Sequence, residues 1–343
     1  MSFLLTALFV FAGNGNPLPA PGGGADSSTA RLIAFGDVNL GRWMGKQILR
    51  GDTSYPFTHI ATLLREADIV FVNLESPISE QHGITESRIS NVVFCAPPAA
   101  ACTLERAHIT VVSTANNHAF DFGLKGVIET LTYLHAQGIG TTGTCDQPAG
   151  NSHTLVITAH AIRVGFAAFT QFVNIHGPWD GYISVYDREG ATAEISRLRA
   201  ESDIVIASFH GGKEFGDSPD EETQDAMHSL IDAGADLVIG HHPHVPQGIE
   251  RYKKKLIFYS LGNFVFIQPQ NYWAQVSYGV DLSIRKNSVG TTIESVHLLP
   301  IRASSQPHLL DSRADVAKLI ERTRKSSTAT IVQENQMYVV QRD

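Results

Sequence analysis

Histidine side chains gather at a few places in this sequence where they could take part in metal chemistry. The chain has 343 residues and contains fifteen histidines. Five of these, His118, His210, His241, His242 and His244, stand in polar clusters that directly follow runs rich in valine and isoleucine. Imidazole is the most common protein ligand for transition metals. This placement predicts a metal centre and is poorly explained by random scatter of histidines.

The segment GHHPHV, residues 240–245, contains the densest group of these histidines. Pro243 favours extended backbone at His242, and side chains two positions apart in extended backbone point the same way. His242 and His244 are therefore expected to face one side together, with His241 turned away. Two imidazoles at a strand end can bind one ion or two adjacent ions. The alternative is that they are surface or core-packing histidines.

Oxygen-bearing side chains in other polar clusters complete the candidate ligand set. Asp37, Glu75 and Asn117 join His118 and His210 in these clusters. Oxygen and imidazole ligands without thiolates suit Mn, Fe or Zn, and ligands from five separate loops suit a two-ion site. In such a site one carboxylate bridges the ions, which polarise a phosphoryl group and generate hydroxide near neutral pH. Taken singly, each residue also suits a turn, a helix cap or a buried histidine with ordinary hydrogen bonds.

Further polar residues near these clusters could contact a substrate or support a ligand. Asp121 is expected to accept the imidazole N–H of His118, the alternative being a helix N-cap. Lys213 and Glu214 follow a His-Gly-Gly segment and are candidate substrate-binding residues, with a solvated loop pair as the alternative. Asn263 in SLGNF could equally contact the site or cap a turn.

Strands that alternate with helices must position these residues. The β-branched runs at 67–75, 108–118, 202–210 and 235–244 are read as buried strands, with a first strand at 31–42. Helices are expected before the four runs, at residues 57–66, 99–106, 191–201 and 221–233. Repeated helix-then-strand order makes the strands parallel, so their C-terminal ends meet at one edge of the sheet. The order of the elements therefore predicts that all the polar clusters converge there.

The second half of the sequence has a different pattern. Residues 248–266 and 276–300 alternate more and contain turn signals, which predicts antiparallel hairpins. The lysines at 253–255 are read as an exposed hairpin tip, with attraction of polyglutamate as the alternative. A helix is expected from the capping residue Ser312, followed by a polar tail outside the core.

Composition excludes several classes of protein. Hydrophobic residues make up 43% of the chain and charged residues 17%, which is typical of a globular fold. The net charge is −8, so a nucleic-acid partner is not expected. Three cysteines are too few for a disulfide framework. Residues 1–30 combine a short apolar run with a Gly/Pro-rich linker and predict an export segment, although no basic residue precedes the run. Residues 31–305 are read as one domain and 306–343 as a C-terminal helix and tail.

Six motifs together carry a family resemblance. GDVNLGR, VNLESPI, TANNHAFDFG, ASFHGGKEF, GADLVIGHHPHVPQGIE and YSLGNFVF occur in this order between residues 31 and 266. They resemble the signatures of the capsule-synthesis family of CapA-type poly-gamma-glutamate synthesis proteins, a branch similar to calcineurin-like metallophosphoesterases. The resemblance implies an α/β fold, a four-layer sandwich of two mixed β-sheets flanked by helices, with the site at the strand ends.

The resemblance also assigns roles to the candidate residues. It implies that His118 interacts with the substrate or the leaving group, so that His118 and the Asp121 expected beside it are the candidate catalytic residues. The centre is expected to hold two divalent ions of Mn, Fe or Zn. The implied metal ligands are Asp37, Asn39, Glu75, Asn117, His210, His242 and His244. Two departures weaken the match, because Asn39 stands where the superfamily's Asp-x-His opening has histidine, and Glu75 stands in place of the bridging aspartate.

Two functions therefore remain open at this point. The first is a metal-dependent hydrolase, similar to phosphoesterases, that acts on a phosphoester or an anionic polymer in capsule synthesis. The second is a non-catalytic accessory protein with a reduced metal site, which binds the polymer or the membrane-bound synthesis and export machinery. The export segment expected within residues 1–30 predicts an extracytoplasmic or membrane-associated location.

Overall fold

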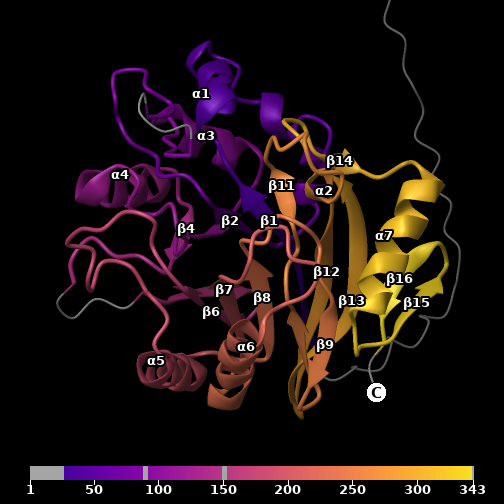
Figure 1. The fold of residues 1–343 in the computed structure, drawn as a ribbon. Helices are drawn as coiled ribbons and strands as arrows, with labels where there is room; N and C mark the ends of the chain where they lie inside the picture. Colours follow the sequence, from indigo (N-terminus) through magenta and orange to yellow (C-terminus); the bar gives the residue numbers. More distant parts are fainter. Residues whose placement is uncertain (1–26, 88–91, 149–152, 342–343) are drawn as a thin grey trace, which may run out of the picture.

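The computed structural model describes residues 27–87, 92–148 and 153–341. Two β-sheets pack face to face, and helices cover their outer faces (Figure 1). The apolar run expected to direct export, residues 3–12, lies outside the described residues. Among the described residues, no helix combines the length and the apolar character needed to cross a membrane.

The first sheet has ten strands and is mixed. Its order is β15-β16-β13-β12-β1-β2-β3-β4, with β11 paired to β1 and β14 paired to β13. Strands β1 to β4 are parallel, whereas β12 and β13 form a long antiparallel hairpin whose first strand also pairs with β1. The strands are β1 (Ser28–Val38), β2 (Ile69–Leu74), β3 (Val111–Ser113), β4 (Gly140–Thr142), β11 (Asn263–Val265), β12 (Val276–Asn287), β13 (Gly290–Arg302), β14 (His308–Leu309), β15 (Ile331–Glu334) and β16 (Met337–Val340).

The second sheet has six strands in the order β5-β6-β7-β8-β10-β9. Strands β6, β7, β8 and β10 are parallel, and β5 and β9 are antiparallel edge strands. The turn between β9 and β10 has φ of +48° at Lys253 and +66° at Lys254, the backbone that a tight two-residue hairpin requires. The strands are β5 (Leu155–Ala159), β6 (Ile162–Thr170), β7 (Ile204–His210), β8 (Leu237–His241), β9 (Ile249–Tyr252) and β10 (Lys255–Phe258).

Helices form the two outer layers. The hydrophobic cluster on the outer face of the first sheet includes side chains of α1 to α4, and the cluster on the outer face of the second sheet includes side chains of α5 and α6. Helix α7 packs near β15 and β16 (Figure 1). The helices are α1 (Arg42–Leu49), α2 (Ala61–Arg65), α3 (Ala99–Arg106), α4 (Gly123–Ala136), α5 (Arg188–Glu201), α6 (Glu221–Ala233) and α7 (Arg313–Lys325), with short 3-10 turns η1 (Tyr55–Phe57) and η2 (Trp273–Gln275).

The main core lies between the two sheets. Along β1, Leu32 contributes to the cluster between the sheets while its neighbour Ile33 joins the cluster under the helices, as the two-residue period of a strand requires. The rings of Phe71 in β2 and Phe166 in β6 stack across the interface with centroids 5.6 Å apart. The predicted four-layer sandwich of two mixed sheets is confirmed.

Several sequence-based expectations are met and two are wrong. The helices expected at 99–106 and 221–233 correspond to α3 and α6, and both hairpins are present. The polar clusters were expected at the strand ends of a single sheet. They lie instead at strand ends of two sheets, because β7 and β8 belong to the second sheet. The tail expected outside the core instead forms β15 and β16, whose Ile331 and Val340 are buried.

Candidate metal centre

The candidate site lies where strand ends of the two sheets meet. Asp37 is the penultimate residue of β1, and Glu75 directly follows β2. His210 and His241 are the last residues of β7 and β8 and are register partners. All four side chains are fully buried. The predicted convergence of the polar clusters is therefore present, although two sheets and not one supply the strand ends.

A glycine allows a neighbouring strand to approach the first of these residues. The amide of Asp37 donates to the carbonyl oxygen of Gly262, at 3.0 Å, just before β11. A Cβ atom at Gly36 would lie 1.7 Å from the same oxygen, so no other residue type fits there without a shift of the backbone. Gly36 thus lets β11 bring Asn263 beside Asp37.

Two overlapping groups of side chains have the geometry of metal ligands. One consists of Glu75, His210 and His242, and the other of Asp37, Glu75 and His244; within each group the ligand atoms lie within 4.8 Å of one another. Glu75 belongs to both groups. Its Oε1 lies 3.7 Å from Nε2 of His210 and 3.6 Å from Nε2 of His244. A carboxylate in this position can bridge two ions.

The shared carboxylate has no hydrogen bond that would explain its burial. Among the described residues, neither oxygen of Glu75 has a hydrogen bond, and Nδ1 of the buried His242 has none. Burial raises the pKa of Glu75 well above its usual range. A carboxylate without hydrogen bonds in a closed interior is unfavourable, and a bound cation would pair with it. The ligand set therefore fits divalent metal, and neither group contains a thiol.

Asp37 is held by histidines and an asparagine. Its Oδ1 accepts a hydrogen bond from Nδ2 of Asn73 at 2.9 Å, and its Oδ2 lies 3.1 Å from Nδ1 of His244. Nδ1 of His241 lies 3.4 Å from Oδ1. Burial alone would raise the pKa of Asp37, but His241 and His244 hold it well below its usual range. Asp37 is therefore a carboxylate at neutral pH and available to bind a cation.

The histidines of the two groups differ in their proton affinity. Burial lowers the pKa of His210 well below its usual range and that of His242 to about 3. Both are neutral at pH 7, as a metal-binding imidazole must be. Burial also opposes the charge on His244, but Glu75 and Asp37 raise its pKa to about 9. In the metal-free chain, a proton on His244 thus partly balances the acidic side chains.

The backbone of GHHPHV differs from the extended path expected from the sequence. His242 has φ of +95° and His244 has φ of +58°, so the chain leaves β8 through left-handed conformations that non-glycine residues rarely adopt. His241 is not turned away either, because it ends β8 on the same face as Leu237 and Ile239 and lies beside Asp37. All three histidines reach the same centre. Such backbone strain is typical of functional sites.

The loop after β3 adds three of the predicted residues. Oδ1 of Asn117 lies 2.8 Å from Nε2 of His210, so the two atoms could bind the same ion. Nδ1 of His118 lies 2.8 Å from Oδ2 of Asp121, which confirms the predicted contact. The same Asp121 oxygen accepts the backbone N–H of Phe94, and the Phe94 ring lies 4.2 Å from the His118 ring. These contacts fix the orientation of the imidazole.

Four other predicted site residues lie around the two groups without joining them. Oδ1 of Asn39 accepts the backbone N–H of Gly41 at 2.9 Å, so its ligand oxygen is already engaged. Asn263 lies against His244 with Oδ1 3.0 Å from Nδ1, and its amide nitrogen donates to other protein groups. Lys213 and Glu214 are exposed on the loop after β7.

Two residues of the centre were missed in the sequence. Asn73 donates to Asp37 and lies 3.1 Å from Nδ1 of His210, so it links the two ligand groups. The sequence signal for Asn73 is an asparagine inside an apolar run that forms the fully buried strand β2. For His241, the extended backbone expected over GHHPHV predicts the wrong side, because His242 and His244 have positive φ. A buried polar residue in an apolar strand usually has a specific partner.

Comparison with known proteins gives one family. The model of the family described as "Bacterial capsule synthesis protein PGA_cap" matches residues 31–268. The capsule biosynthesis protein CapA of Bacillus anthracis is 27% identical over 311 residues, which cover 87% of this chain and 73% of that protein. The PGA biosynthesis protein CapA of Bacillus subtilis strain 168 is 28% identical over 349 residues, which cover 98% and 88%.

Among solved structures, the calcineurin-like phosphoesterase YfkN from Bacillus subtilis matches with a TM-score of 0.45 and 12% identity, covering 88% of this chain and 98% of that one.

Proposed function

Because this chain belongs to the PGA_cap family of bacterial capsule synthesis proteins, we propose that it is a divalent-metal-dependent hydrolase, similar to phosphoesterases, that acts in capsule or poly-gamma-glutamate synthesis at the cell envelope. One observation carries the proposal. Glu75 is buried, has no hydrogen bond among the described residues, and belongs to two ligand groups at once. A carboxylate in this setting has a clear role as the bridge of a two-ion centre and none in packing.

The proposed ligands divide between two ions of Mn, Fe or Zn. Asn117, His210 and His242 would hold one ion, Asp37 and His244 the other, and Glu75 both. Such ions polarise a phosphoryl group and supply hydroxide near neutral pH. Asn39 is left out of this set, because its Oδ1 closes a local turn onto the backbone N–H of Gly41, whereas Oδ1 of Asn117 lies against the ligand atom of His210.

Residues around the ligands would orient them. Asn73 fixes Asp37 and the ring of His210, and Asn263 fixes His244. We assign Asn263 a positioning role and not the substrate contact expected from the sequence, because its hydrogen-bonding groups already have protein partners. Loss of such outer partners typically weakens metal affinity or activity by about 10- to 100-fold.

His118 would handle the proton of the leaving group. With its Nδ1 donating to Asp121, the ring presents Nε2 to the substrate. A proton on Nε2 passes to the alcohol oxygen as the phosphorus–oxygen bond breaks, and water supplies the hydroxide that forms the new bond. The carboxylate of Asp121 stabilises the imidazolium before the transfer and keeps the ring in place.

The alternative is an accessory protein that binds polymer or synthesis machinery without turnover. Asn39 favours this alternative, because it stands where the superfamily's opening motif has a histidine ligand and its oxygen is engaged by Gly41. Fewer strong ligands would reduce the occupancy of one ion.

Turnover of simple phosphoesters distinguishes the two functions. We expect Mn²⁺-loaded protein to hydrolyse 4-nitrophenyl phosphate or bis(4-nitrophenyl) phosphate, and Asp37→Ala and His210→Ala each to lower kcat/KM by about 100-fold or more. His160→Ala is the matched control, because this exposed histidine pairs with Asp68 at the surface. Turnover that survives both site substitutions would refute the site. Full metal loading without turnover of either ester would favour the accessory function.

A further inference from the structure

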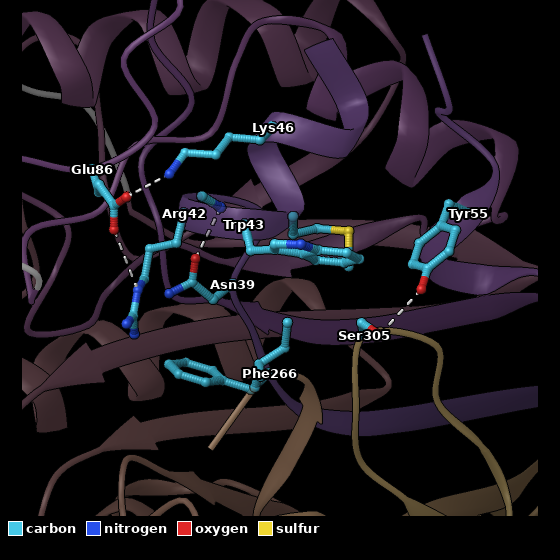
Figure 2. A pocket seen from close by; sticks show the side chains of 11 residues that line it. Asn39, Arg42, Trp43, Lys46, Tyr55, Glu86, Phe266 and Ser305 are labelled. Carbon is cyan, nitrogen blue, oxygen red and sulfur yellow. Dashed lines mark hydrogen bonds and ion pairs between the residues drawn. The ribbon is translucent and has the colours of Figure 1, made fainter. Parts of the chain in front are cut away.

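A pocket with a volume of about 520 Å³ adjoins the metal centre (Figure 2). It is lined by the start of α1, by η1 and by the segment after β11. Phe266 lines this pocket, and its ring centroid lies 4.8 Å from that of His244. Asn39, two residues after Asp37, also lines it. The pocket and the metal centre therefore share a wall, and one ligand could reach both.

One end of the pocket presents hydrogen-bond donors. Glu86 pairs with Lys46 at 2.7 Å and with Nε of Arg42 at 3.7 Å, which leaves one net positive charge among the lining side chains. Asn39 is 6% exposed, and its amide nitrogen has no acceptor among the described residues. Figure 2 shows this nitrogen and the terminal nitrogens of Arg42 at the same end of the pocket, away from Tyr55. A buried donor without a partner beside a guanidinium is suited to an anionic oxygen group.

The other end of the pocket is aromatic. Trp43 and Tyr55 meet edge to face with centroids 5.7 Å apart, and the hydroxyl of Tyr55 lies 3.4 Å from that of Ser305. Trp43 and Ile267 are each 43% exposed, which is high for large apolar side chains. Apolar walls with a few converging polar groups are typical of small-molecule pockets.

The backbone at the pocket is also unusual. Arg42 has φ of +50°, and its N–H donates to the carbonyl oxygen of Thr85 at 2.7 Å. A left-handed arginine is unfavourable, so the surrounding structure must hold it. The guanidinium carbon lies 5.6 Å from the centroid of the Phe94 ring, which in turn packs on His118. The ring of Phe94 therefore lies between the guanidinium of Arg42 and the proposed proton donor His118.

We propose that this pocket binds the alcohol portion of the substrate and selects one that carries an apolar ring and a second anionic group, a carboxylate or a phosphoryl group. This proposal rests on the proposed function in one respect, because only an enzyme has a substrate. Binding of such a molecule in the pocket does not require turnover. Arg42, Lys46 and the amide nitrogen of Asn39 bind the anion, and Trp43 with Tyr55 contacts the ring.

Binding of phosphonates tests this without hydrolysis, because their carbon–phosphorus bond is not cleaved. Calorimetric titration of Mn²⁺-loaded protein would compare methylphosphonate, phenylphosphonate, 4-carboxyphenylphosphonate and 1,4-phenylenediphosphonate. We expect phenylphosphonate to bind more tightly than methylphosphonate, and at least one of the probes with a second anion to bind about tenfold more tightly than phenylphosphonate. Comparison of the last two probes tells whether a carboxylate or a phosphoryl group is preferred.

Two variants separate the two ends of the pocket. Arg42→Gln should abolish the preference for the second anion, and Trp43→Ala should abolish the preference for the ring. Both side chains are partly exposed, so the variants are expected to fold. Arg50→Gln is the matched control, because Arg50 caps the far end of α1 and should leave both preferences unchanged.

Failure of the pocket proposal and failure of the hydrolase proposal give different results. Equal affinity for all four probes in the wild type, or preferences that persist in Arg42→Gln and Trp43→Ala, would overturn the pocket assignment. The protein could instead bind the probes with preferences that depend on Arg42 and Trp43 but show no phosphoester turnover. That result would support the pocket and refute the hydrolase.

Discussion

Replacement of Glu75 by glutamine should have opposite effects on the metal-free and the metal-loaded protein. In the metal-free chain the carboxylate is buried without a hydrogen bond, and burial raises its pKa well above the usual range. Glutamine has nearly the same shape and no charge to bury. We therefore expect Glu75→Gln without metal to have a Tm equal to or above that of the wild type.

With metal the order should reverse. At a free Mn²⁺ concentration of 100 Kd, each bound ion stabilises the folded chain by about 2.7 kcal/mol, so two ions contribute about 5 kcal/mol. For a domain of this size this corresponds to a rise in Tm of about 10 °C. Because Glu75 belongs to both ligand groups, Glu75→Gln should lose most of this rise, whereas His242→Ala should keep about half.

Differential scanning calorimetry with and without Mn²⁺ measures both effects. Glu129→Gln is the control carboxylate, because Glu129 accepts hydrogen bonds from Ser79 and from the amide of Glu80. It should lower Tm without metal and keep the full Mn²⁺ effect. The reasoning would be refuted if Glu75→Gln lowered the metal-free Tm by several degrees and still showed the wild-type response to Mn²⁺.

Three further predictions concern the rest of the fold. Partial burial would raise the pKa of Asp203, but Arg163 and Lys286 lower it, so its contribution to stability is present above about pH 4 and is lost as the pH falls. Asp203→Asn should therefore cost about 1–2 kcal/mol at pH 7 and less at pH 3 in urea unfolding; an equal cost at both pH values would contradict this. Burial raises the pKa of Cys95 to about 12, so iodoacetamide at pH 8 should modify it only after unfolding, as mass spectrometry would detect. Gly36→Ala should lower the free energy of unfolding by about 3 kcal/mol or more and remove the rise in Tm with Mn²⁺, because the added Cβ meets a backbone oxygen at 1.7 Å. A stable variant with normal metal binding would argue against the close contact between Gly36 and Gly262.

The sequence was sufficient to find most of the candidate ligands because strand ends carry local signals. A β-branched run followed by a polar cluster identifies the end of a buried strand, and this rule located Asp37, Glu75, His210 and His242. It could not show which sheet each strand joins, since strand pairing depends on contacts far apart along the chain. For the same reason β15 and β16 looked like a polar tail, although their pairing with β13 buries Ile331.

Local conformation explains the remaining differences. The positive φ at His242 is imposed by the surrounding structure, whereas the following proline favours extended backbone. That conformation brings His242 to the side on which His241 already ends β8. An asparagine flanked by apolar residues carries no motif, so the sequence does not point to Asn73, whereas its contacts with Asp37 and His210 place it in the centre.

Metal content is the most direct test of the two-ion centre that shares Glu75. Inductively coupled plasma mass spectrometry on protein reconstituted with Mn²⁺, Fe²⁺ or Zn²⁺ would count the ions per chain. We predict about two ions in the wild type, about one in His242→Ala and close to none in Glu75→Gln. Two ions retained in Glu75→Gln, or none in the reconstituted wild type, would contradict the shared centre.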